Sequence, residues 1–142
     1  MSMTPSVSIV LALALSFTGC AAQTPRQVLD AEQSQVQLRS IQSRSFDTTD
    51  KEKTMRTVIA TLQDLDFLVE NADLILGSVT GTKFYRNVAI KMTVTVRAKG
   101  EKQMIVRANA QYGLRAVEVP GPYQDFFAAL EKAMFLTAQQ VD

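Results

Sequence analysis

Two stretches of alternating apolar and polar residues, joined by a short polar segment, constrain the fold of this chain more than any other feature. Residues 88–97 and residues 104–111 both alternate strictly, and Lys99-Gly100-Glu101-Lys102 between them is typical of a tight turn. Because successive side chains of a strand point to opposite faces, each stretch predicts a strand with one apolar and one polar face. The pair therefore predicts an antiparallel hairpin in a sheet that is covered on one side.

Two apolar stripes at helical spacing predict the helices that cover the sheet. The first helix is expected to begin with a capping box formed by Thr49 and Glu52. The second is expected to begin at Pro122, because proline suits the first helical position. The first stripe consists of Met55, Val58, Ile59, Leu62 and Leu65, and the second consists of Tyr123, Phe126, Phe127, Leu130, Met134 and Phe135. We expect the aromatic residues of the second stripe to form core rather than a ligand pocket.

Shorter segments complete the predicted fold. Residues 44–47 are expected to form a first strand, and residues 67–69 a short strand or the lead into the next one, followed by a turn at Asn71-Ala72-Asp73. A further strand is expected at residues 74–83, where internal glycines indicate a bulge or a close backbone approach. The predicted fold class is α+β in the order β-α-β-β-β-α, an antiparallel sheet with two helices packed on one face.

The N-terminal segment has the pattern of an export signal. An apolar run at residues 7–17 is followed by Thr18, Gly19 and Cys20, the single cysteine of the chain. A secretory signal has an apolar region of about 7–15 residues before small residues at the cleavage site, whereas a transmembrane helix needs about 18 or more apolar residues. The segment resembles the lipobox of bacterial lipoproteins. The resemblance implies lipidation of Cys20 with acyl chains such as palmitate, and sorting to the outer membrane because Ala21 follows the cysteine.

On this interpretation the chain has three parts. Residues 1–19 are a signal peptide, residues 20–42 a lipid-anchored tether, and residues 43–142 a single α+β domain. Apolar residues of the tether are too irregularly spaced to predict a regular helix, so we expect it to be loosely helical or extended.

The composition argues against several kinds of chemistry. The chain has 15 basic and 14 acidic residues, a net charge of +1, whereas nucleic-acid-binding domains are typically strongly basic. It has no histidine, the commonest general base and metal ligand, and its one cysteine is assigned to the lipid. Motifs of activated serine nucleophiles are missing from the sequence. We therefore predict a protein that is not an enzyme, with no catalytic residue, no metal, no cofactor and no nucleic-acid partner.

Basic residues on the polar face of the predicted hairpin are the candidate binding residues. Lys91, Arg97 and Arg107 fall on polar sides of neighbouring strands, where they could form one patch. Further cations that could extend it are Lys83, Arg86 and Arg115. Such a patch suits anionic lipid headgroups or an acidic protein, while ordinary sheet surface is the simpler interpretation of each residue taken alone.

A second resemblance covers about residues 44–140. It is carried by RSFDTTD at residues 44–50, TLQDL at residues 61–65, GSVT at residues 77–80 and YQDFFAALEKA at residues 123–133. These segments resemble small outer-membrane lipoproteins of Gram-negative bacteria that have a BamC-like domain, a type of domain found in the β-barrel assembly machinery. The resemblance implies a helix-grip fold, in which an antiparallel sheet holds helices on one face, and it carries over no functional residue.

These observations together predict a non-enzymatic outer-membrane lipoprotein that faces the periplasm and binds or assembles a partner protein of the cell envelope. One alternative is a carrier that holds a lipid or another small apolar ligand in a helix-grip cavity. Another is a structural lipoprotein of a secretion or efflux complex.

Overall fold

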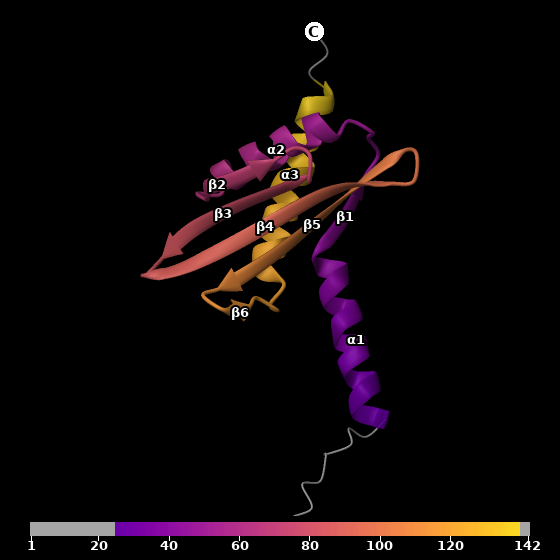
Figure 1. The fold of residues 1–142 in the computed structure, drawn as a ribbon, viewed down its shortest axis with the longest axis vertical. Helices are drawn as coiled ribbons and strands as arrows, with labels where there is room; N and C mark the ends of the chain where they lie inside the picture. Colours follow the sequence, from indigo (N-terminus) through magenta and orange to yellow (C-terminus); the bar gives the residue numbers. More distant parts are fainter. Residues whose placement is uncertain (1–24, 140–142) are drawn as a thin grey trace, which may run out of the picture.

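The computed structural model describes residues 25–139, and it confirms the predicted α+β class (Figure 1). The signal peptide and Cys20 lie outside these residues. The elements are α1 (Pro25–Ile41), β1 (Ser43–Phe46), α2 (Lys51–Asp64), β2 (Leu68–Asp73), β3 (Ser78–Tyr85), β4 (Val88–Lys99), β5 (Gln103–Tyr112), β6 (Arg115–Ala116) and α3 (Gly121–Gln139). Compared with the predicted order, which has three strands between the two helices, the structure adds a helix before β1 and has five strands between α2 and α3.

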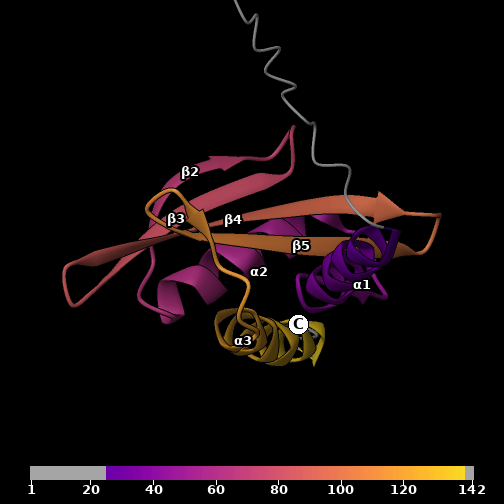
Figure 2. The same ribbon diagram turned by 90° about the horizontal axis from the view of Figure 1, so that it is seen from below.

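The sheet is antiparallel in every pairing, in the order β1-β5-β4-β3-β2, and β6 also pairs with β5. Its central pair β4–β5 is the predicted hairpin, with Lys99 opposite Gln103 and a positive φ of 64° at Gly100 in the turn. The predicted alternation is confirmed, and the buried face consists of Ile90, Met92, Val94, Val96, Met104, Val106, Ala108 and Ala110. In Figure 2, α2 and α3 lie on one side of the sheet.

The two helical stripes supply the other half of the core. Buried stripe residues are Met55, Val58 and Leu62 from α2 and Tyr123, Phe126, Phe127 and Leu130 from α3. The rings of Phe126 and Phe127 meet edge to face at 5.1 Å. The prediction that Phe135 belongs to the core was wrong, because its side chain is 63% exposed. At 3.6 residues per turn, position 135 lies about 120° around the helix from Tyr123, outside the buried stripe.

The start of α2 differs from the predicted capping box. Asp50 is the N-cap, and its side chain accepts a hydrogen bond from the Lys53 backbone N–H at 2.9 Å. Glu52 instead forms an ion pair with Arg56 one turn later. Aspartate is at least as good an N-cap as threonine, so the helix begins one residue later than the sequence pattern suggested.

The region around β2 also differs from the prediction. Strand β2 runs through the expected turn at residues 71–73, with a register shift against β3 between Val69 and Asn71. The turn lies instead at residues 74–77, which were expected to begin the next strand. Pairing with β3 has therefore overridden the turn preference of Asn71 and Asp73. As a result, three aliphatic residues occupy a turn.

A continuous helix, α1, occupies residues that we expected to be loosely helical or extended. Ile41 at its end packs against the core and Gln42 is buried, whereas Val36 is 64% exposed. Figure 1 shows α1 projecting away from the sheet. Most of the described side chains between residues 32 and 40 are exposed, and a helical segment that faces solvent needs no apolar stripe.

A single buried hydroxyl joins four segments at the outer edge of β5. β1 and β6 each cover part of this edge, and between them Ala108 N–H donates to the Gln42 carbonyl at 2.9 Å. The Tyr123 hydroxyl accepts hydrogen bonds from Gln42 Nε2 and from the Ala110 N–H, both at 3.1 Å, and donates to the Val117 carbonyl at 2.6 Å. Tyr123 thus ties α3 to the sheet where its edge is interrupted.

Removal of this hydroxyl should destabilise the domain. In Tyr123→Phe the groups on Gln42, Ala110 and Val117 lose a buried partner, and one unsatisfied buried group costs about 1–3 kcal/mol. We expect the free energy of unfolding, measured by urea denaturation, to fall by at least that amount. Tyr112→Phe is the control, because this ring is 40% exposed and its change should stay within about 0.5 kcal/mol. Equal losses in both variants would contradict a bracing role for Tyr123.

Candidate functional site

The face of the sheet opposite the helices is rich in hydroxyl and amide side chains. They align in rows across the strands, because antiparallel partners lie on the same face. One row runs through Ser78, Thr95, Arg107 and Ser43, and the next runs through Thr80, Thr93 and Asn109. The hydroxyls of Thr80 and Thr93 are 3.2 Å apart and share a hydrogen bond. Apart from Arg107, the side chains of these two rows are neutral donors and acceptors.

Two hollows lie next to each other on the polar face. The first, called here the arginine hollow, has a volume of about 420 Å³ and is lined by Thr95, Arg97, Ile105, Arg107 and Asn109. The second, the amide hollow, has a volume of about 350 Å³ and is lined by Gln42, Lys91, Thr93, Asn109, Ala110, Gln111 and Ala116. Asn109 borders both, so the two hollows form one uneven surface along β5.

The structure brings together two of the three predicted binding residues. Arg97 lies opposite Ile105, and Arg107 is the next residue of β5 on the same face. Such diagonal neighbours have Cα atoms about 7–8 Å apart. Lys91 lies six residues before Arg97 on β4, about 20 Å away along the strand. The three cations therefore do not form a single patch.

The cations expected to extend the patch lie elsewhere. Lys83 is on the helix side of the sheet, where its Nζ donates to the Leu65 carbonyl at 2.8 Å and lies 3.8 Å from Asp66. Arg115 lies opposite Tyr112 in the β5–β6 pair, and Tyr112 borders a hollow beside α3. Arg86 is in the β3–β4 turn with a positive φ of 45°. The prediction that these residues extend the patch was therefore wrong.

Lys99 joins Arg97 and Arg107 instead, and the sequence analysis missed it. It lies on the same face of β4 as Arg97, and its Nζ donates to Ser45 Oγ at 2.9 Å. The alternation that placed Lys91 and Arg97 on the polar face continues through position 99, so this signal was present in the sequence. Assigning Lys99 to the turn hid it.

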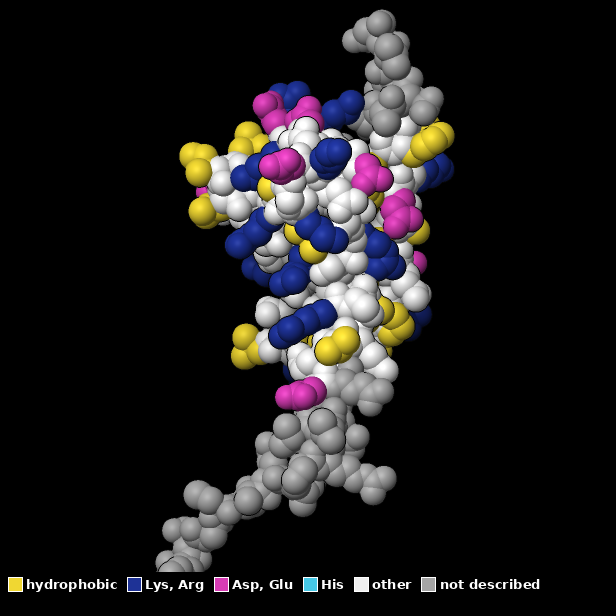
Figure 3. Space-filling view, turned by 90° about the vertical axis from the view of Figure 1, so that its right-hand side faces the viewer, with side chains coloured by type: hydrophobic (Ala, Val, Ile, Leu, Met, Phe, Trp, Pro, Cys, Tyr) yellow, Lys and Arg dark blue, Asp and Glu magenta, His cyan; other side chains and the backbone are white. Residues whose placement is uncertain are grey.

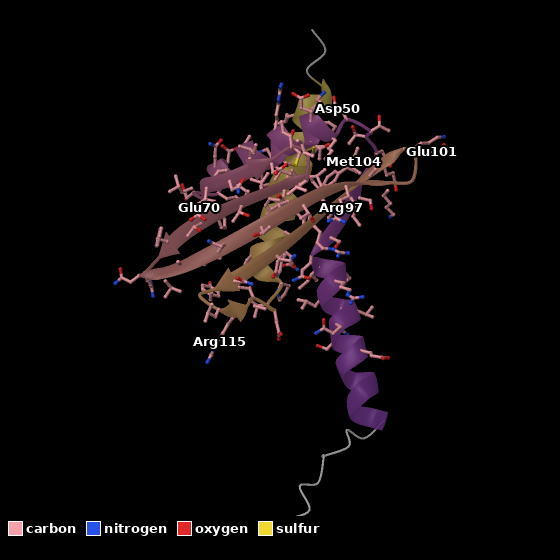
Figure 4. All side chains as sticks on the ribbon, viewed as in Figure 1. Asp50, Glu70, Arg97, Glu101, Met104 and Arg115 are labelled. Carbon is pink, nitrogen blue, oxygen red and sulfur yellow. The ribbon has the colours of Figure 1, made fainter. Side chains whose placement is uncertain are left out.

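These three cations have no carboxylate partner among residues 25–139. Arg107 Nε donates to Ser43 Oγ at 3.3 Å, which is a neutral acceptor. By contrast, Lys91 Nζ lies 3.3 Å from a carboxylate oxygen of Glu70. Figure 4 shows Arg97 and Glu70 well apart on the sheet, and Figure 3 shows Lys and Arg side chains gathered on the middle of one side of the domain. Unpaired positive charge is thus concentrated in and beside the arginine hollow.

The arginine hollow has the chemistry of an anion receptor. A guanidinium group binds a carboxylate or phosphate through two parallel hydrogen bonds, and Arg97 and Arg107 present two such groups side by side. Thr95 and Asn109 also line this hollow and add neutral donors. The arrangement supplies binding groups but no nucleophile with a neighbouring base.

The larger hollows on the helix side are electrostatically different. One of about 580 Å³ is lined by Asp50, Glu52, Lys53, Arg56, Thr57, Ala60 and Ala133. Its charges are matched, since Glu52 pairs with Arg56 and Asp50 caps α2. It therefore has less net attraction for a charged ligand than the arginine hollow.

Neither a metal cluster nor a membrane-spanning helix is found in the part of the chain that the structure describes. Among residues 25–139, no three His, Cys, Asp or Glu side chains come together as metal ligands. Within the same range, no helix is both long enough and apolar enough to cross a membrane. In comparisons with known proteins, no protein-family model matches this chain, and no curated protein matches it.

Glu70 is the acidic partner of Lys91 on the polar face. It lies at the register shift of β2, and its carboxyl pKa is lowered by interaction with the Thr82 hydroxyl first and with Lys91 second. The ionised carboxylate is therefore favoured in the folded state, and it neutralises the Lys91 end of this face.

Glu70 should consequently contribute stability that depends on pH. A carboxyl with a lowered folded-state pKa stabilises the fold above its unfolded pKa of about 4.3 and loses this effect as the pH falls through the folded value. We expect Glu70→Gln to lower the free energy of unfolding at pH 7, with the difference from wild type shrinking towards zero in acid. Urea titrations from pH 7 to pH 3 measure it. A difference that does not vary with pH would contradict the assigned ion pair.

Proposed function

We propose that this protein is a non-enzymatic, lipid-anchored outer-membrane lipoprotein that faces the periplasm and docks an acidic partner protein of the cell envelope. The observation that carries the proposal is the adjacency of Arg97 and Arg107 in a hollow, with no carboxylate partner among the described residues. Two like charges held side by side repel each other, and an acidic partner would relieve that repulsion.

The surroundings of the arginine hollow favour binding of a protein over catalysis. Its residues stand on β4 and β5, the central hairpin of the sheet, so their backbone positions are held by cross-strand pairing. Exposed charges of this kind mainly accelerate association and set its salt dependence. Neighbouring Ser and Thr side chains can then adapt their hydrogen bonds to a protein surface.

The position of α1 suits an anchored module. Its 17 residues span about 25 Å, and it leaves the domain at the end opposite the start of α2 (Figure 1). A lipid attached at Cys20 would therefore hold the sheet at a distance from the membrane. With this spacer, a partner could reach the polar face.

The alternative of an apolar-ligand carrier has less support. The space between sheet and helices is filled by large side chains, each less than 2% exposed, which include Tyr123, Phe126, Phe127, Leu62 and Met92. An apolar ligand in a helix-grip cavity would have to displace some of them, and core packing of this density resists that. A structural role in a secretion or efflux complex differs from our proposal only in having a permanent partner.

The anchor is tested by Cys20→Ser. The proposal requires the thiol as the acceptor of the diacylglyceryl group, so the variant should lose membrane association or accumulate as an uncleaved precursor. Fractionation of cells and mass spectrometry of the mature N-terminus measure both results. Unchanged membrane association with a processed chain would overturn the lipoprotein assignment.

The docking face is tested by charge reversal of Arg97 and Arg107 to Glu in the lipid-anchored chain. We expect wild type to co-purify one recurrent envelope protein at low salt, with recovery falling as salt rises, and the double variant to lose it. A matched control reverses Lys53 and Lys132, which are exposed on the helices and change the net charge equally. Equal recovery by both double variants would count against this face as the docking site.

A further inference from the structure

The turn between β2 and β3 exposes three consecutive large aliphatic side chains. The exposed fractions are 51% for Leu74, 90% for Ile75 and 69% for Leu76, and we call these residues the aliphatic turn. Single exposed apolar residues are common on protein surfaces, but contiguous ones frequently mark an interaction site.

The aliphatic turn is held in place from three sides. Leu76 N–H donates to Asp73 Oδ1 at 2.8 Å, and Lys51 Nζ at the start of α2 donates to the Ile75 carbonyl at 2.9 Å. Val96 N–H on β4 donates to the Gly77 carbonyl at 2.8 Å. A partner that binds here would meet a backbone that is already ordered, so binding would not carry the entropic cost of ordering this turn.

Glycine at position 77 is required for this arrangement. Its φ is +69°, and a Cβ atom there would lie 2.4 Å from the Val96 carbonyl oxygen. No other residue could keep both the turn geometry and the close approach to β4 without strain. The sequence therefore places the aliphatic turn directly against the end of β4.

The aliphatic turn is next to the unpaired cations of the polar face. Ser78 lies opposite Thr95, so the preceding turn residues run beside the part of β4 that carries Arg97 and Lys99. In Figure 1 the β2–β3 turn and the β4–β5 hairpin lie towards the same end of the domain, and α1 leaves from the other end. The aliphatic turn and the cations near the end of β4 thus lie on neighbouring segments at the same end of the domain.

We propose that the aliphatic turn is the apolar anchor of the docking site, and that it inserts into an apolar recess of a protein whose rim carries carboxylates facing Arg97 and Lys99. This inference rests on the proposed docking function and adds the apolar half of the partner's chemistry. Charge complementarity favours an acidic rim. A protein is favoured over a lipid bilayer because the surface lies at the end of the domain away from α1, which leads to the proposed anchor.

The two halves of the site have separable effects. The cations speed association and make it salt-sensitive, whereas burial of the aliphatic turn slows dissociation. We expect Ile75→Ser to weaken partner binding about tenfold, which corresponds to about 1.4 kcal/mol. Because Ile75 is 90% exposed, the melting temperature should not change.

Site-specific photo-crosslinking of the full chain in intact cells tests the inference. The photoreactive residue benzoylphenylalanine is placed at Ile75, at Asn109 in the arginine hollow, or at Gln63, an exposed position on α2. We expect Ile75 and Asn109 to crosslink to the same protein and Gln63 not to. With the probe at Asn109, Ile75→Ser should lower the crosslink yield about tenfold, and Leu74→Ser serves as a second variant.

Leu114→Ser is the matched control. Leu114 is 100% exposed in the β5–β6 turn, so the variant removes an equally accessible aliphatic side chain at another site. It should leave the Asn109 crosslink unchanged. Combined reversal of Arg97 and Lys99 to Glu should lower the crosslinks from both Ile75 and Asn109.

The outcomes separate this inference from the docking function on which it rests. A crosslink from Asn109 without one from Ile75, or an Asn109 crosslink insensitive to Ile75→Ser and Leu74→Ser, would overturn the aliphatic anchor and leave docking in place. Crosslinks from Ile75 into lipid alone would overturn a protein partner for this turn. Failure of both positions to crosslink would overturn the docking function itself.

Discussion

The rest of the structure depends on the hydrogen bonds of one buried group, the Tyr123 hydroxyl. It forms hydrogen bonds with the Gln42 side-chain amide, the Ala110 N–H and the Val117 carbonyl, at the point where neither β1 nor β6 covers the edge of β5. The same bonds fix α3 over the sheet, so the apolar stripe and the strand edge are positioned together. Gln42 and Ala110 also line the amide hollow, which means that the core directly supports the polar face.

The apolar, polar and charged surfaces of the domain lie on different faces and at different ends. One face of the sheet is buried under α2 and α3, and the other remains open and polar. Along the open face, Glu70 neutralises Lys91, whereas Arg97 and Arg107 face no acid among the described residues. The charge imbalance and the aliphatic turn therefore meet at one end, although the chain as a whole is nearly neutral.

Most of the fold could be predicted from local patterns. Alternation in β4 and β5 and the stripes of α2 and α3 depend on the geometry of a single strand or helix, so they are visible in the sequence. The turn at residues 74–77 and the cap at Asp50 could not be predicted in the same way. In each case neighbouring residues have a similar local preference, for the N-cap or for a turn. Pairing of β2 with β3 determined where the turn lies.

The sequence by itself determined which side chains face the core and which face water, including Arg97, Arg107 and the overlooked Lys99, because side-chain direction follows residue parity. It did not determine which of these cations are neighbours. Only the tertiary structure decided that Arg97 meets Arg107, that Lys91 pairs with Glu70 and that the aliphatic turn lies beside β4. Those contacts depend on strand register and on the shift in β2, which arise from pairing between distant segments.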